Sequence, residues 1–182
     1  MQLPLSAVLG VAAVVSLAAA APFLLTVRQG PAVRAMLEKL PRERVSGTIL
    51  TVIALLWCIP NIRPIFQPDS PFQVFILPLI LLAMALAAIF LNYLFARAAA
   101  GILILGAHTV LKEAYPAQLP GYSVLAALVL IAGVIGIVIS AKPYWLRDWF
   151  RLSFRNPAVR WSSAAYFLML CAMLCFCAVE AA

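Results

Sequence analysis

Apolar runs of membrane-spanning length recur along the chain, and the gaps between them alternate between basic and nearly uncharged. Of the thirteen Lys and Arg residues, all but Arg63 and Lys112 fall in every second gap. Because cationic side chains in short loops resist translocation, the three basic gaps are predicted to share the cytoplasmic side of a membrane. Their cations are Arg28, Arg34, Lys39, Arg42 and Arg44 in one gap, Arg97 in the next, and Lys142, Arg147, Arg151, Arg155 and Arg160 in the third.

The composition supports a membrane protein, since 66% of the residues are hydrophobic and only 10% are charged. An ordinary soluble domain needs more polar surface than this. At roughly 20 residues per span, the chain has room for about six spans and short loops. We expect an all-α fold, a polytopic transmembrane helical bundle that forms one integral membrane domain over residues 1–182. The predicted spans are 3–27, 45–66, 72–95, 98–115, 122–141 and 161–179.

Two of the basic gaps have the pattern of short amphipathic helices that lie on the cytoplasmic interface. In the gap from 28 to 44, apolar residues at helical spacing oppose charged ones. In the gap from 142 to 161, aromatic residues accompany arginines spaced four apart. We expect the second helix to contact anionic lipid headgroups. The residues assigned to that contact are Arg147, Arg151, Arg155, Trp145 and Trp149.

The first span has no basic residue before it and several after it, which predicts an uncleaved anchor with its N-terminus outside. An even number of spans then places the C-terminus outside as well. The expected location is a bacterial-type inner membrane. The chain should reverse direction between Asn92 and Ala99, so that Arg97 lies in a loop and the fourth span starts at residue 98. In the fifth span, the small residues Ala132 and Gly136 should allow a neighbouring helix to approach closely.

One group of polar residues is a candidate ligand site. His108 and Lys112 are four residues apart with Glu113 beside them, and Asn61 and Arg63 are expected at a similar depth on the second span. These side chains would line an outward-facing pocket that binds a small polar ligand or relays protons. The alternative is that they mark the outer interface, with His108 hydrogen-bonded to a neighbouring carbonyl.

The sequence lacks the motifs of common catalytic sites. A single histidine excludes a metalloprotease site with two histidines, and Asp69 and Asp148 are expected in loops on opposite sides. Walker, dinucleotide-binding and serine-hydrolase motifs are also missing. We therefore predict no catalytic residue, metal or cofactor, and favour a protein without enzymatic activity. The basic loops adjoin apolar spans, which favours lipid headgroups over nucleic acid as their partner.

The four cysteines lie inside apolar runs, where cysteine usually acts as a small hydrophobic residue. A disulfide between Cys58 and Cys175 is the alternative.

These patterns support two functional hypotheses. The first is an accessory or scaffold subunit of a membrane assembly, with another membrane protein or a second copy of the chain as its partner. The alternative is a small carrier or lipid-handling protein that uses the polar cluster around His108 and Lys112.

Overall fold

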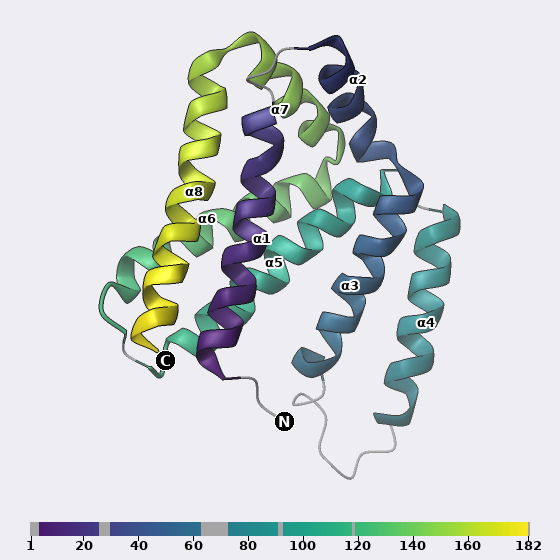
Figure 1. Ribbon diagram of the computed structural model, residues 1–182. Helices are drawn as coiled ribbons and strands as arrows, with labels where there is room; N and C mark the ends of the chain where they lie inside the picture. Colours follow the sequence, from purple (N-terminus) through teal and green to yellow (C-terminus); the bar gives the residue numbers. More distant parts are fainter. Residues whose placement is uncertain (1–3, 26–29, 63–72, 91–92, 118, 182) are drawn as a thin grey trace.

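The computed structural model describes residues 4–25, 30–62, 73–90, 93–117 and 119–181, and within these ranges the chain is helical without strands. Figure 1 shows long helices side by side, with two short helices at one end of the bundle. The helices are α1 (Leu5–Leu25), α2 (Pro31–Lys39), the 3-10 turn η2 (Leu40–Arg42), α3 (Arg44–Ile62), α4 (Gln73–Phe90), α5 (Leu94–Ala114), α6 (Tyr122–Ala141), α7 (Tyr144–Arg155) and α8 (Pro157–Glu180).

Four of the described helices are long and apolar enough to cross a membrane: α1, α5, α6 and α8. The apolar part of α3 is shorter, from Arg44 to Ile59. The all-helical prediction is therefore confirmed together with four candidate spans. The helix α6 has the predicted bounds of 122–141, and each of the other long helices begins or ends within a few residues of a predicted span.

The two short helices occupy the basic gaps, and local signals set their limits. Pro31 stands in the first turn of α2, where its missing N–H breaks no hydrogen bond. Between α7 and α8, the side chain of Asn156 accepts a hydrogen bond from the backbone N–H of Ala158 at 2.9 Å. Pro157 occupies the first turn of α8. This cap and proline explain why α7 and α8 are two helices and not one.

The start of α5 differs from the prediction. Tyr93 has a left-handed backbone with φ of 62°, which is uncommon for a residue other than glycine, and α5 begins directly after it at Leu94. The helix α5 therefore begins at Leu94, whereas the predicted span began at residue 98. As a result Arg97 lies in the first turn of α5 and not in a loop.

The long helices pack in two groups that meet along α5. The helix α1 lies along α8, while α5 packs against both α6 and α3, and α4 packs on α3. Gly136 of α6 is buried at the contact with α5, where an added Cβ would lie 2.9 Å from the carbonyl oxygen of Ala100. The close approach predicted for this pair of residues is therefore confirmed at Gly136.

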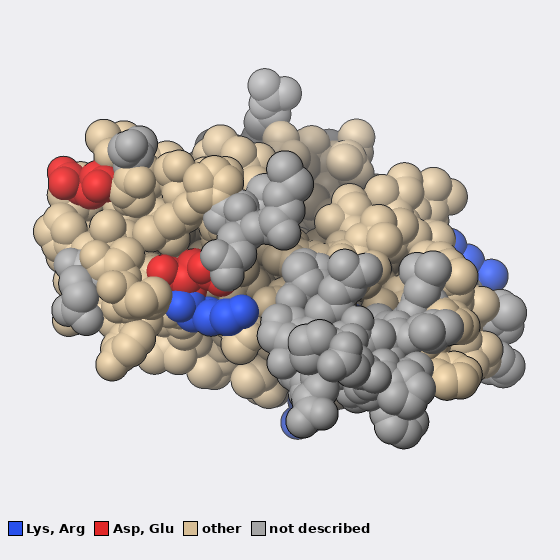
Figure 2. Space-filling model, turned by 90° about the horizontal axis from the view of Figure 1, so that it is seen from below, with Lys and Arg blue, Asp and Glu red and all other residues tan. Residues whose placement is uncertain are grey.

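The charged residues are distributed unequally between the two ends of the bundle. The start of α1 and the end of α8 lie at one end, and α2 and α7 lie at the other (Figure 1). Within the described ranges, every Lys and Arg except Lys112 belongs to α2, η2, α7, the connection after α6, or the first turn of a long helix. We call the end formed by α2, η2 and α7 the basic end. Figure 2 shows the opposite end, where charged side chains are few among the residues drawn in colour.

Candidate lipid-binding groove

An apolar groove of about 250 Å³ lies between α1 and α3, next to the basic end. Both helices pack on α5, which forms the floor of the groove. Residues from six helices and η2 line it, and all of the lining residues are apolar except for the indole N–H of Trp149. They include Ala18 and Phe23 of α1, Leu40 of η2, Leu50 of α3, Phe95 and Ile102 of α5, Ile139 of α6, Trp149 and Phe150 of α7, and Phe167 of α8.

Small side chains explain why the space is open. Ala18 and Ala19 of α1 face the groove, and Ala99 of α5 lies on its floor. A helix that presents methyl groups instead of larger side chains leaves volume that its neighbours do not fill. The groove is therefore a product of the alanine clusters in α1 and α5.

Aromatic rings form the wall at the basic end. The ring centroid of Phe23 lies 5.0 Å from that of Trp149, 5.7 Å from that of Phe150 and 6.0 Å from that of Phe167. The indole Nε1 of Trp149 donates a hydrogen bond to the Ser163 hydroxyl at 3.0 Å. Because this bond satisfies its polar atom, the rest of the Trp149 ring is left as apolar wall.

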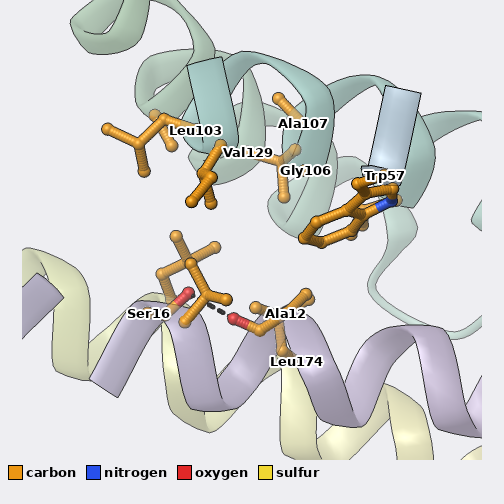
Figure 3. Close-up of a pocket in the computed structure, with 13 residues that line it drawn as sticks. Ala12, Ser16, Trp57, Leu103, Gly106, Ala107, Val129 and Leu174 are labelled. Carbon is orange, nitrogen blue, oxygen red and sulfur yellow. Dashed lines mark hydrogen bonds between the residues drawn. The ribbon is translucent and has the colours of Figure 1, made fainter. Parts of the chain in front are cut away.

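A smaller pocket of about 40 Å³ continues the groove toward the middle of the bundle. The two spaces share Val15, Ile102 and Leu103. Figure 3 shows Ala12 and Ser16 of α1 on one side of this pocket, and Trp57 of α3 with Gly106 and Ala107 of α5 on the other. The Ser16 hydroxyl donates to the carbonyl of Ala12 at 2.9 Å, so it offers no free donor to a ligand. We call this space the inner pocket.

The chemistry of the groove suits hydrocarbon. Apolar cavities of about 150 Å³ stay dry and take up small apolar molecules, because water finds too few polar partners there. The groove extends from Val15 to Phe23 on α1 and from Phe95 to Leu103 on α5, which is about 12 Å at 1.5 Å per residue. That length is close to the hydrocarbon depth of one bilayer leaflet, about 15 Å. One acyl chain of a lipid matches this shape.

The members of the predicted polar cluster that the structure describes lie outside the two spaces described above. His108 is exposed and makes no hydrogen bond to another described residue, while Lys112 approaches its neighbour Glu113 at 3.9 Å. The side-chain amide of Asn61 donates to the carbonyl of Trp57 at 3.1 Å within α3. Neither the groove nor the inner pocket is lined by these residues. Arg63 lies outside the described residues.

The residues predicted to contact lipid headgroups differ in their surroundings. Trp145 is 47% exposed, with the ammonium of Lys142 at 5.3 Å from its ring centroid, and Arg155 is exposed. Trp149 instead faces the groove. Arg147 pairs with the adjacent Asp148 at 3.2 Å, and Arg151 is engaged by an acid of another helix.

This acid is Glu38 of α2, and its ion pair with Arg151 joins the two short helices. Its carboxylate lies 3.2 Å from the guanidinium of Arg151 on α7 and 3.1 Å from that of Arg34 on its own helix. The Arg34 guanidinium also lies 5.9 Å from the ring centroid of Phe154. The hydrogen bonds from Arg151 and then Arg34 hold the pKa of Glu38 below its ordinary value. The carboxylate thus stays charged and keeps α2 beside α7 near neutral pH.

The groove was not predicted from the sequence, since its walls come from helices that are distant along the chain. The sequence contains one feature that could have indicated the groove. Ala18 to Ala21 form an alanine cluster in the first span, and Ala98 to Ala100 form a second cluster at the start of the fourth. Facing alanine clusters on two helices indicate either close packing or unfilled space.

All four cysteines are free thiols in the structure, so no disulfide joins Cys58 to Cys175. The residues of the described ranges form no cluster of three or more His, Cys, Asp and Glu side chains suited to a metal ion.

Comparison with known proteins gives no relative: no family, curated protein or solved structure matches the chain.

Proposed function

We propose that this chain is a multi-pass membrane protein that binds one lipid acyl chain in the groove between α1 and α3, and so belongs to the lipid-handling class. In the proposed arrangement, the six long helices cross the bilayer and the basic end faces the cytoplasm of a bacterial-type inner membrane. The helices α2 and α7 lie at the headgroups there. The groove is the observation that supports this function, because it is apolar, one leaflet deep and next to the basic end.

Quenching of tryptophan fluorescence tests the proposal. Of the four tryptophans, Trp149 lines the groove. Replacing Trp57, Trp145 and Trp161 with Phe leaves it as the sole reporter. The purified full chain in detergent is titrated with a phospholipid brominated on its acyl chains. We expect quenching that saturates near one lipid per protein.

A matched pair of variants distinguishes the groove from general contact with lipid. Ala18 lines the groove, whereas Ala21 is exposed on the same helix and does not. Ala18→Phe should fill the groove and abolish saturable quenching, while Ala21→Phe should leave it unchanged. Equal quenching in both variants, or quenching that never saturates, would contradict the proposal.

An accessory subunit remains the second candidate, and α4 is the observation that favours it. Among the described helices, α4 packs mainly on α3 and exposes Phe75, Leu79 and Leu82, each by more than half of its surface. A span of another membrane protein would cover this face. Purification in mild detergent tests this function: a co-purifying protein that is lost in Leu79→Trp but retained in Val134→Trp on α6 supports it. A lone monomer contradicts it.

A further inference from the structure

One end of the groove lies where α3 crosses α5. Gly47 of α3 is buried against the start of α5, and the next turn of α3 brings Leu50 to the groove, beside Phe95 of α5. Leu40 of η2 lines the same end. These three apolar residues mark the rim of the groove that is nearest to the basic end.

Three exposed cations lie next to these residues in the chain. Lys39 and Arg42 flank Leu40 in sequence, and Arg44 precedes Gly47 by one helical turn on the same face. We call Lys39, Arg42 and Arg44 the rim cations.

The charges of the rim cations are largely uncompensated. Lys39 and Arg44 make no ion pair with another residue in the described parts of the chain. The acid among them, Glu43, accepts a hydrogen bond from the Ser46 hydroxyl at 3.0 Å. On α7, by contrast, Arg147 and Arg151 are already paired with carboxylates.

Arg42 is the most firmly placed of the three. Its guanidinium donates a hydrogen bond to the Tyr93 hydroxyl at 2.7 Å and lies 5.0 Å from the centroid of the same ring. Tyr93 is a neutral partner, so the positive charge of Arg42 remains available to an anion. A guanidinium held in place in this way loses less side-chain entropy when it binds a phosphate.

From this arrangement we infer that the groove selects an anionic phospholipid, whose phosphate binds the rim cations while one acyl chain occupies the groove. The inference rests on the proposed function and adds the headgroup class to it. An amphiphile with a negative head and a hydrocarbon tail is complementary to cations at the mouth of an apolar groove. The lipid belongs to the leaflet at the basic end, and its second acyl chain remains in the bilayer.

The test compares two brominated phospholipids with identical chains, one with an anionic phosphatidylglycerol headgroup and one with a zwitterionic phosphatidylcholine headgroup. In the protein whose sole tryptophan is Trp149, the anionic lipid should reach half-saturation of quenching at a concentration at least tenfold lower. The preference should shrink at high salt, because exposed charges are screened.

Two triple variants of equal net charge locate the effect. The first replaces the three rim cations, as Lys39→Gln, Arg42→Gln and Arg44→Gln. It should lose most of the preference, by about fivefold for each cation removed, and still bind the zwitterionic lipid. Lys142→Gln with Arg147→Gln and Arg155→Gln removes three cations elsewhere at the basic end and should keep the preference.

The outcomes separate this inference from the proposed function. Equal affinity for both lipids, or equal loss of preference in both triple variants, overturns the headgroup assignment and leaves acyl-chain binding intact. Absence of saturable quenching by either lipid overturns both.

Discussion

Gly47 of α3 lies directly against the backbone of Phe95 in α5, so that a Cβ added to Gly47 would come within 2.7 Å of the Phe95 nitrogen. The obstacle is backbone and not the end of a flexible side chain. The two helices would have to separate to admit even a methyl group. This contact fixes how closely α3 approaches α5 at that end of the groove.

Gly47→Ala should therefore destabilise the protein, by about 1–3 kcal/mol as for other overpacked sites. Gly101→Ala on α5 is the control, because an added Cβ there meets nothing within 4 Å and alanine favours helix. Thermal unfolding in detergent should show a Tm several degrees lower for Gly47→Ala and unchanged or higher for Gly101→Ala. The same Tm in both variants would mean that the helices separate without cost.

Ser163→Ala should lower the stability by about 1–3 kcal/mol, because it leaves the Trp149 N–H without its partner in a half-buried position. Ser162→Ala is the matched control, since that neighbouring serine is exposed and bonds only the carbonyl of Val159. Thermal unfolding measures both variants, and a red shift of Trp149 emission should accompany the first. An equal change in the two variants would contradict the assigned role.

Glu38→Gln should loosen α2 from α7 and lower the Tm by about 1–2 °C at neutral pH, as expected for an exposed ion pair. Asp148→Asn should have less effect, because its partner Arg147 is on the same helix. Since the pKa of Glu38 is lowered in the folded protein, its stabilisation is present above the ordinary value of 4.5 and is lost as the pH falls through the lowered pKa. The Tm difference between wild type and Glu38→Gln should disappear in that acidic range. A difference that persists there would exclude ionisation as its cause.

Reporter fusions test the proposed orientation. A reporter that is active only in the cytosol should give no signal at either end of the chain, whereas one that is active only outside should give signal at both. A cytosolic signal at one end would show an odd number of spans. A cytosolic signal at both ends would reverse the orientation and place the groove in the outer leaflet.

Much of the fold could be predicted because hydrocarbon length and loop charge are local properties. The bounds of α6, between Tyr122 and Ala141, follow from an uninterrupted apolar run, and α7 follows from the spacing of Arg147, Arg151 and Arg155. The start of α5 was harder to predict. The turn before α5 uses a left-handed backbone at Tyr93, where the sequence has no glycine to indicate it. The helix therefore begins early enough to include Arg97.

The site could not be predicted in the same way, because it depends on which helices are neighbours. The sequence spacing of His108 and Lys112 shows that they share a helix face, but not what that face meets. Ala18 and Phe95 both line the groove although they are far apart in sequence, and Glu38 pairs with Arg151 of a different helix. Such pairings arise from tertiary packing, which local patterns do not specify.

The pairing of α1 with α8 has a consequence for biosynthesis. Because α8 is synthesised after the helices α2 to α7, α1 meets its main partner only after those helices have been made. Until α8 is present, the face of α1 that α8 covers is exposed to lipid. A nascent chain that ends before Pro157 lacks Phe167 and therefore lacks part of the groove wall. The groove is thus closed by a contact between helices that are far apart in the sequence.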